Sequence, residues 1–461
     1  MTRPRIEHLG LLVGECTLPG ETRADNIFCA QPNGIPLGAD RWLLIYATRG
    51  YRLVDDENSI VYQIREGAPD GRVLREGFFA RAREGWDVLG DGRLLVKEHC
   101  HCSAFGVPRG AMIRGKPVPH ANRFVACWYA LGKEWNGNRL EHTDELVRRT
   151  LRAEWIQFKL NERGDDIEFL MPAQPMRQVG YESGPHFCSL PAIWTNNSFK
   201  NATPCNEEAT EWVQVQGMGQ EGDRCDGPGA TAFLAPVRFR FNPSRDLYEW
   251  VETGPPVGWP GPIGESSLLR YRDSWIFTGR TKGPILWYRT DDLFGAHPPC
   301  AAIEMTHPNS HSPHTAHLCP DGVVRLLVGD HTVSPHRNAR DPLYLWDVDP
   351  DHGFRLTRRQ TVFDSVAAGL SIRKEAIPRV DYGNLLPHTG GRVQHLVHRV
   401  RTKVVDLPDK TGTVVNLSEK AVHGIYHARL VYDHEFPGIW QFGSPAQDPG
   451  TCNITVKKAN R

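Results

Sequence analysis

Two histidines and two cysteines alternate in the stretch KEHCHCSAFGVPRG, residues 97–110. Successive side chains of a β-strand point to opposite faces, so we expect His99 and His101 on one face and Cys100 and Cys102 on the other. A zinc site needs four ligands that converge on one ion, which alternation prevents. We therefore predict that the cysteines pack between sheets and that the histidines face another environment, with a central channel as the candidate.

A third histidine precedes the next expected strand. His120 lies in VPHANRFVACWY, residues 118–129, and follows His99 by 21 residues. The connection between them is short and rich in turn residues, which is consistent with adjacent strands. An imidazole titrates near neutral pH and suits proton transfer. We predict that His99 and His120 face a channel together and share proton transfer; a pair of hydrogen-bonded structural histidines is the alternative.

Four further histidines gather in HPNSHSPHTAH: His307, His311, His314 and His317. Prolines at 308 and 313 exclude a continuous helix through this stretch. The spacing is compatible with a metal site. It is equally compatible with a polar loop whose histidines contact water or substrate.

Strand signals recur along the chain, each a turn with Gly or Asp followed by a short apolar run. They begin near residues 38, 90, 271, 319 and 389, with weaker examples at 164–172 and 206–217. Seven such units predict an all-β fold, a seven-bladed β-propeller of four-stranded sheets around a channel. A two-sheet sandwich with added domains is the alternative. The best helix candidate covers only residues 141–155.

No shift in composition marks a domain boundary. We therefore expect residues 1–461 to form a single propeller domain, with residues 1–25 and 437–461 peripheral. The last strand signal, residues 426–436, is expected to pair with N-terminal strands and close the ring.

Bulk properties exclude several partners. Lys and Arg together number 54, as do Asp and Glu, so no global basic field favours nucleic acid. No run of eighteen apolar residues suggests a membrane span, and the first residues lack a signal-peptide pattern. We expect a cytoplasmic protein of unspecified oligomeric state, whose eleven cysteines are reduced and mostly buried.

Three stretches resemble a group of known enzymes: SIVYQIREGAPDGRVLREG (59–77), FGVPRGAMIRGKPVPHANRFVACWY (105–129) and LLPHTGGRVQHLVHRVRTK (385–403). They look like the seven-bladed propeller lyases that cut next to glucuronate, namely the ulvan lyases, the rhamnosyl-glucuronate lyases and the related family first described as rhamnosidases. The resemblance spans about residues 25–435. Those families carry a pair of channel histidines, matched by His99 and His120, and often hold a structural metal ion, here zinc or calcium.

The resemblance implies β-elimination next to a 4-substituted glucuronate in a rhamnosyl-glucuronate or ulvan-like oligosaccharide, a reaction that requires no cofactor. Removal of the C5 proton creates negative charge beside the carboxylate, which an arginine stabilises. Arg280 ends an expected strand and is the candidate for that role, while Tyr181 is an approximate match to the families' tyrosine. Residues expected to bind substrate are His101, Arg177, Lys200, His314 and Arg399.

Other functions stay open. A rhamnosidase-type glycoside hydrolase on the same propeller is the first alternative, and a non-catalytic propeller that binds a partner is the second. A sialidase propeller is discounted, because its repeated Ser-x-Asp-x-Gly-x-x-Trp box is absent and YRTDDLFG (288–295) is only a faint echo of it. The chain also lacks a phosphate-binding loop and a Gly-x-Ser-x-Gly elbow.

Overall fold

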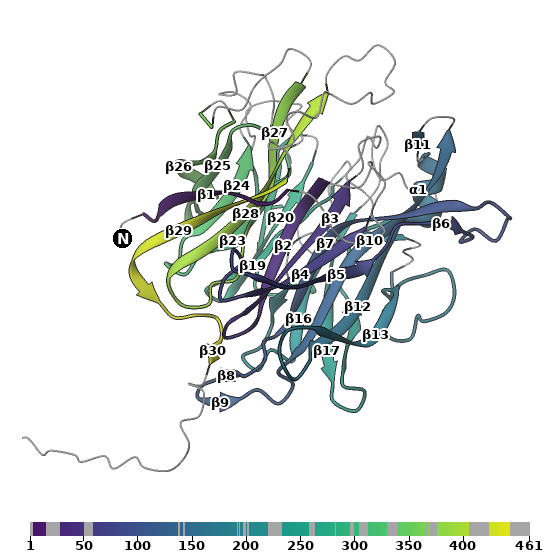
Figure 1. Ribbon diagram of the computed structural model, residues 1–461, viewed down its shortest axis with the longest axis horizontal. Coiled ribbons are helices and arrows are strands. Elements are labelled where there is room, and N and C mark those ends of the chain that lie inside the picture. The colour runs from purple at the N-terminus through teal and green to yellow at the C-terminus, as the bar shows by residue number, and fades with distance from the viewer. Residues whose placement is uncertain are drawn as a thin grey trace, which may run out of the picture.

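The strands of this chain are organised into sheets around a common centre. The structure is a computed structural model, shown in Figure 1. It describes residues 3–14, 28–49, 59–136, 139–141, 143–190, 192, 194–196, 200, 202–219, 233–257, 263–281, 283–295, 299–303, 312–329, 340–365, 367–368, 376–404 and 424–442.

Six antiparallel sheets of four or more strands follow one another along the described residues. Blade I contains β2 (Phe28–Gly38), β3 (Arg41–Arg49), β4 (Ile60–Glu66) and β5 (Val73–Ala80). Blade II contains β6 (Arg83–Trp86), β7 (Leu95–Val107), β10 (Arg123–Asn136), β11 (Arg139–Glu141), β12 (Arg152–Leu160) and β13 (Ile167–Pro175). Blade III contains β14 (Trp194–Asn196), β15 (Thr203–Pro204), β16 (Glu211–Gly219), β17 (Phe233–Asn242) and β18 (Leu247–Thr253).

The remaining three blades are more regular. Blade IV contains β19 (Leu268–Tyr271), β20 (Ser274–Arg280), β21 (Ile285–Thr290) and β22 (Ala301–Ile303). Blade V contains β23 (Thr315–Leu318), β24 (Val324–Gly329), β25 (Leu343–Asp349), the 3₁₀ turn η1 (Pro350–His352) and β26 (Arg355–Phe363). Blade VI contains β27 (Ala376–Leu385), β28 (Gly391–Val404), β29 (Gly424–Phe436) and β1 (Arg5–Val13).

Inner strands of successive blades contact one another around the axis: β27 with β2, β2 with β7, β15 with β19, β19 with β23, and β23 with β27. Between the blades lie separate apolar cores. One joins blades I and II around Ile45, Trp128 and Phe158, and another joins blades II and III around Phe105 and Trp250. The fold is therefore an all-β propeller, as the strand signals predicted.

The predicted number of seven blades is wrong, because the structure forms six. The turn signals near residue 90 and at 164–172 both lie in blade II, the first before β7 and the second between β12 and β13. Counting them separately produced the extra blade. A local turn signal marks a hairpin and does not reveal which sheet the hairpin joins.

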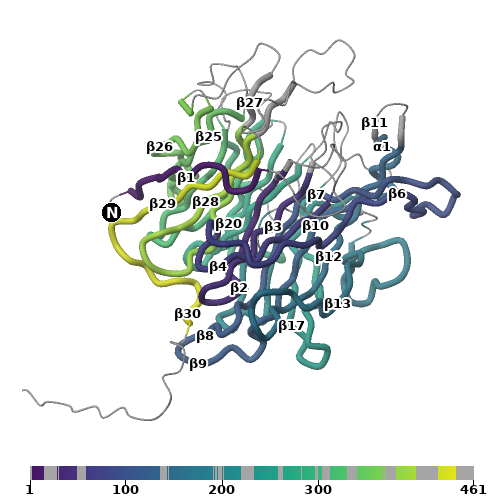
Figure 2. Tube along the Cα trace, in the orientation of Figure 1, coloured from purple at the N-terminus to yellow at the C-terminus, as the bar shows by residue number. Residues whose placement is uncertain are grey.

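The ring closes through strands from the two ends of the described chain. Strand β1 pairs antiparallel with β29, with Arg5 opposite Val431 and Val13 opposite Ile425. Figure 2 shows β1 in purple running beside β29 in yellow. The predicted pairing of residues 426–436 with an N-terminal strand is confirmed, and residues 5–13 form the outer strand of blade VI.

Two smaller features complete the fold. Helix α1 (Asp144–Thr150) begins at the N-cap Thr143, whose side chain accepts a hydrogen bond from Leu146 N, and β12 takes over at Arg152, so the helix is shorter than residues 141–155. A small sheet of β8 (Ala111–Ile113), β9 (Lys116–Pro117) and β30 (Gln441–Phe442) lies at one end of the molecule (Figure 1). Among the described residues, no helix is long and apolar enough to cross a membrane.

Removal of residues 1–13 is expected to lower the free energy of unfolding by several kcal/mol, roughly 3 or more, because it exposes the edge of β29 and the apolar side chains beneath β1. Urea unfolding followed by circular dichroism measures the loss. Leu9→Ala is the control, since Leu9 is 40% exposed and its truncation should change stability by less than about 0.5 kcal/mol. Equal stability of the truncated and intact chains would contradict ring closure through β1.

Candidate functional site

The inner strand of blade II is interrupted at the histidine–cysteine stretch. Ser103 pairs with Cys127 and Cys100 pairs with Tyr129, so two residues of β7, His101 and Cys102, lie opposite one residue of β10. His101 has a φ of 49°, in the left-handed region that costs a non-glycine residue about 1 kcal/mol or more. This two-against-one arrangement is a β-bulge, and it redirects the His101 side chain.

The same kind of β-bulge recurs in the inner strands of the two preceding blades around the ring, blades I and VI. In β2 the register shifts between Ala30 and Asn33, and Gln31 has a φ of 53°. In β27 it shifts between Asp381 and Asn384, and Tyr382 has a φ of 52°. In each strand a bulged polar residue replaces regular pairing at the level of His101 in the ring.

Blade IV carries a fourth example just before β19. Gly264 pairs with Arg280, and Thr278 N donates to Ser267 O, which leaves Glu265 and Ser266 opposite Gly279. Glu265 has a φ of 34°. Four inner strands thus place a polar residue of left-handed backbone conformation toward the centre: Gln31, His101, Glu265 and Tyr382.

Three of these residues meet across the axis. His101 Nε2 lies 3.7 Å from Glu265 Oε1 and 3.5 Å from Tyr382 Oη. The Glu265 carboxylate forms an ion pair with Arg280, whose Nη1 donates to Oε2. The side chains of Glu265 and Arg280 are 10% and 18% exposed, so solvent reaches both only at the edge.

Electrostatics keep the Glu265 carboxyl ionised. Burial would raise its pKa, but the charges of Arg280, His101 and Lys200 reverse this and lower the pKa to about 2. At neutral pH the group is therefore an anion that orients its cationic neighbours. It is not a proton donor.

Two more arginines of the cluster lie on the side of blade VI. Arg399 Nε donates to Asp381 Oδ1 at 2.7 Å, and Arg399 Nη2 forms an ion pair with the same oxygen at 2.6 Å. Arg340 Nη1 donates to Asp381 Oδ2 at 2.7 Å. The Arg399 guanidinium also lies 4.3 Å from the centre of the Tyr382 ring. Both arginines therefore hold the strand that carries Tyr382, and Arg340 is the more exposed at 15%.

Blades III and V add one buried nitrogen base each. Lys200 is 4% exposed, and burial lowers its pKa well below the ordinary value despite the nearby charge of Glu265. His314 Nε2 lies 2.9 Å from Thr278 Oγ1. Burial and the charge of Lys200 lower the pKa of His314 to about 3, so this imidazole is neutral at physiological pH.

Formal charges in this axial cluster do not balance. Among the described residues, three arginines (Arg280, Arg340 and Arg399) accompany two carboxylates (Glu265 and Asp381), and the buried Lys200 with its lowered pKa lies beside them. Such an excess of positive charge in a low-dielectric centre favours an anionic group of a ligand. A phenol, an imidazole and a carboxylate lie within the same cluster and are groups that transfer protons.

The structure separates the predicted histidine pair. His99 pairs in register with Ala130 and lies 3.8 Å from Glu154, edge-on to Trp128. His120 precedes the other end of β10, where Arg123 pairs with Val107. Eight residue steps along β7 separate these levels, roughly 25 Å at the usual rise of a strand.

His120 has a structural environment. Its Nε2 lies 3.0 Å from Ala209 O and its ring stacks on Phe241. The predicted joint proton transfer by His99 and His120 is therefore wrong. The predicted alternation is also wrong at its centre, because the bulge begins at His101, the second of the two histidines of β7.

The cysteines of β7 are buried, as predicted. Cys100 Sγ donates to Gln31 Oε1 at 2.8 Å, and Cys102 Sγ to Gln31 O at 3.6 Å. Because the bulge intervenes, they join different apolar clusters, Cys100 with Leu131 and Cys102 with Phe124. The hydrogen bonds of both cysteines to Gln31 connect blade II to blade I.

Other predicted residues divide into two groups. Arg280, His101, Lys200, His314 and Arg399 all belong to the axial cluster. Arg177 and Tyr181 lie in the loop after β13, where Arg177 Nη1 donates to Tyr181 O and to two further carbonyls. That loop pairs with β18 through Gln178 and Trp250, so it is not gathered with the axial residues.

The predicted histidine metal cluster is not assembled from the residues that can be placed. His307 and His311 lie outside the described residues. His314 contacts Thr278, whereas His317 Nε2 accepts a hydrogen bond from Leu385 N at 3.3 Å. These two histidines therefore have separate structural partners.

Five residues of the cluster were missed by sequence reasoning: Gln31, Glu265, Arg340, Asp381 and Tyr382. Three of them are bulge residues followed by Pro, Ser or Gly, as in QP, ES and YG. A polar residue before a small or rigid one, in or just before an inner strand, is the available signal. It is weak, because such pairs are common in turns.

A separate cavity of about 530 Å³ occupies the other end of the axis. Its walls are mostly apolar and include Phe105, Leu385 and Trp440. Lys200, Ser267 and Asn384 also line it, which places it beneath the charged cluster. The axis therefore has one polar and one apolar end.

Comparison with known proteins gives structural matches alone. No protein-family model matches the chain, and no curated protein matches its sequence significantly. The fold is similar to that of Trypanosoma rangeli sialidase in complex with the inhibitor DANA, with 12% identity over 93% of this chain and a TM-score of 0.56. This chain spans about 60% of the length of that sialidase.

Two further structures have a similar fold. A Dyadobacter fermentans protein of unknown function has 9% identity and a TM-score of 0.52, covering 93% of this chain and 99% of its own. The parainfluenza virus 5 hemagglutinin-neuraminidase has 9% identity and a TM-score of 0.50, covering 93% of this chain and 94% of its own. At such identities the similarity establishes the fold alone, an all-β propeller of the sialidase type.

These findings overturn the resemblance to the glucuronate lyases. The implied propeller has seven blades, whereas this chain forms six and matches sialidases. The predicted lyase activity and its uronate substrate are corrected with it. The absence of the aspartate box did not exclude the sialidase type of propeller, because a short local motif does not determine how strands pair.

The pair Glu265–Arg280 is expected to show strong coupling in a double-mutant cycle. Glu265→Gln or Arg280→Met alone should lower the free energy of unfolding by about 3–5 kcal/mol, because each leaves a buried charge without its partner. The double variant should lose less than the sum of the single losses. Additive losses in urea unfolding would contradict a direct buried ion pair.

Acid should destabilise the protein through its buried histidines. Burial and Lys200 lower the pKa of His317 from 6.5 to about 3, so the folded state binds fewer protons than the unfolded state between these values. Stability is therefore complete above about pH 6.5 and falls as the pH drops, by roughly 1.4 kcal/mol per unit for each such histidine.

Unfolding free energies between pH 6 and 4 measure this dependence. His317→Gln should reduce the slope by about that amount, whereas His352→Gln, at an exposed position, should leave it unchanged. An unaltered slope in His317→Gln would refute the neutral buried imidazole.

Proposed function

We propose that this propeller is a sialidase-like glycoside hydrolase that acts on a glycan carrying a carboxylate-bearing sugar. The observation that carries the proposal is the excess of positive charge at the axis, where Arg280, Arg340 and Arg399 outnumber the carboxylates and a phenol lies beside an imidazole. Guanidinium groups bind carboxylates through two parallel hydrogen bonds. Arg280 and Arg340 are the more solvent-accessible arginines of the cluster and are assigned to the ligand carboxylate.

Tyr382 is assigned as the nucleophile. Sialidases differ from most glycosidases in using a tyrosine in this role, and one similar structure is described as T. rangeli sialidase in complex with 2,3-difluorosialic acid as a covalent intermediate. In this chain Arg399 lies over the Tyr382 ring and His101 Nε2 lies 3.5 Å from its oxygen. Attack by the phenolic oxygen breaks the glycosidic bond.

His101 is assigned to proton transfer in this scheme. Its Nε2 receives the phenolic proton as Tyr382 attacks, and the imidazolium then donates that proton to the departing oxygen. Glu265, held ionised, lies 3.7 Å from the same nitrogen and stabilises the imidazolium. Water subsequently cleaves the tyrosyl–sugar bond and restores the phenol.

A second candidate is a non-catalytic carbohydrate-binding propeller. It is favoured because both axial carboxylates among the described residues are bound to arginines. Glu265 is ion-paired with Arg280, and Asp381 accepts hydrogen bonds from Arg340 and Arg399. Neither is a protonated carboxyl that could assist departure of the aglycone.

The 4-methylumbelliferyl glycoside of sialic acid discriminates these functions. For the hydrolase, Tyr382→Phe should lower kcat by at least about a hundredfold with little change in KM, because the nucleophilic oxygen is lost while the cationic cluster remains. The control Tyr271→Phe, on a tyrosine that hydrogen-bonds Asp351 in another part of the propeller, should retain full activity.

Binding without turnover, measured by calorimetry with sialyllactose and lost in Arg280→Met, would support the binding module. Full activity of Tyr382→Phe would overturn the assignment of the nucleophile. If the intact protein neither hydrolyses nor binds sialosides, the proposed ligand class is wrong.

A further inference from the structure

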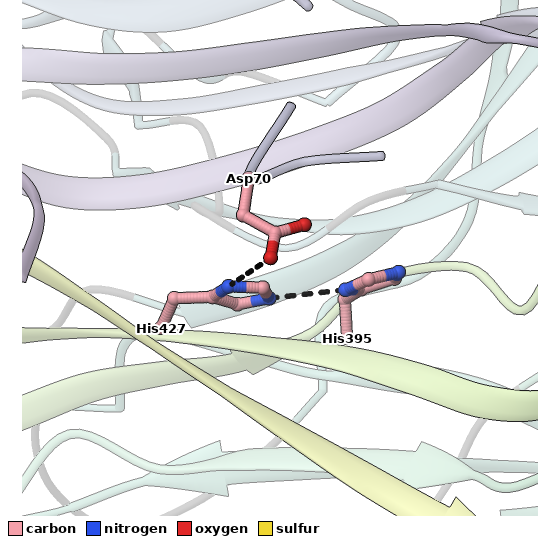
Figure 3. Close-up of side chains that lie close together, drawn as sticks. All are labelled: Asp70, His395 and His427. Carbon is pink, nitrogen blue, oxygen red and sulfur yellow. Dashed lines mark hydrogen bonds and ion pairs between the residues drawn. The ribbon is translucent and has the colours of Figure 1, made fainter. Parts of the chain in front are cut away.

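A cluster of three metal-ligating side chains lies outside the axial site, where the first and last blades meet. Asp70 belongs to the turn between β4 and β5 of blade I, while His395 and His427 belong to β28 and β29 of blade VI. One ligand atom from each residue lies within 4.8 Å of the others. Figure 3 shows the Asp70 carboxylate directed toward His427 and the two imidazoles facing each other.

We infer that Asp70, His395 and His427 bind a divalent transition-metal ion of the zinc class. Two imidazole nitrogens and one carboxylate oxygen match the ligands that zinc takes in tetrahedral sites. Calcium and magnesium prefer sets of oxygen ligands and fit this cluster poorly. Three protein ligands leave a fourth position for water.

The distances are close to those of a bound site. His395 Nδ1 lies 3.0 Å from His427 Nε2, and His427 Nδ1 lies 3.7 Å from Asp70 Oδ2. Ligands about 2.0–2.1 Å from one zinc ion lie slightly more than 3 Å apart, so small rotations of the side chains would open the ion's position. The two imidazole planes are nearly parallel, with an angle of 19°.

His427 supplies a second, independent observation. The residue is 2% exposed, yet its Nδ1 makes no hydrogen bond within the described part of the chain. A buried polar atom without a hydrogen bond costs about 1–3 kcal/mol, so its presence calls for a function. This nitrogen is directed toward the carboxylate of Asp70 and is available to bind a metal ion.

Protonation supports the same assignment. Burial lowers the pKa values of His395 and His427 to about 4, so both rings are neutral at physiological pH, the form that binds metal. Titratable groups around them are Asp70, Arg65, Arg429 and His388. The two arginines have other acceptors, since Arg65 donates to Gln63 and Arg429 lies 3.4 Å from Glu7.

Position in the fold indicates what the ion would do. The edge of the Trp42 ring of β3 faces His395, and the apolar core between blades VI and I includes Trp42 and Val397. A metal ligated from both blades would join them beside this core. It would act as a cross-link at the place where the ring closes.

Titration of the intact, tag-free protein with zinc chloride tests the site. The exposed thiol Cys300 is first changed to serine, so that zinc binding to it does not contribute. Calorimetry should give one zinc ion per chain, and the thermal midpoint should rise with zinc concentration. Calcium chloride should produce neither effect.

Variants locate the ion. Asp70→Ala, in an exposed turn, and His395→Ala should each weaken zinc binding by more than about a hundredfold and abolish the thermal shift. His352→Ala is the matched control, because His352 forms an exposed pair with Asp349 at 2.8 Å and should bind zinc no differently from the parent.

Absence of zinc binding, or undiminished binding in Asp70→Ala and His395→Ala, would overturn the inference. The three residues would then form only a hydrogen-bonded structural chain.

Discussion

The axial cluster depends on a repeated β-bulge in the inner strands. A regular strand would send alternate side chains into the two inter-blade cores and none consistently along the axis. One extra residue, held in the left-handed region at His101, Glu265 and Tyr382, turns a polar side chain toward the centre. The backbone strain of each bulge is borne by the sheet on either side, whose hydrogen bonds resume within one residue.

Charge determines what such a centre can hold. Buried arginines require partners, and Glu265 and Asp381 supply them while leaving the cluster cationic among the described residues. The same arrangement keeps Glu265 ionised and Tyr382 positioned by Arg399. The same arginines therefore serve two purposes. Their ion pairs hold the inner strands together, and their excess over the carboxylates creates the positive potential that favours an anionic ligand.

Closure of the ring imposes a second requirement. Blade VI is built from both ends of the described chain, so strands β27, β28 and β29 meet blade I at a junction that noncovalent contacts hold. Its core, the buried Asn384–Asn33 hydrogen bond of 2.8 Å and the Asp70–His395–His427 cluster all lie along that junction. Polar contacts here specify the register of the last blade against the first, because a shifted register would bury them without partners.

The sequence alone determined the class of fold and half of the axial cluster. Turn signals and short apolar runs predicted an all-β propeller closed by residues 426–436, because strand periodicity and turn chemistry are local properties. Arg280, His101, Lys200, His314 and Arg399 were identified as candidates from residue type and strand position, and the structure gathers these five. Tertiary structure alone decided the number of blades, since hairpins at 90 and 164 share one sheet. It also decided which histidine faces the axis and brought Glu265 and Tyr382 to it, because a bulge arises from the register between two strands and leaves no periodic trace in either one.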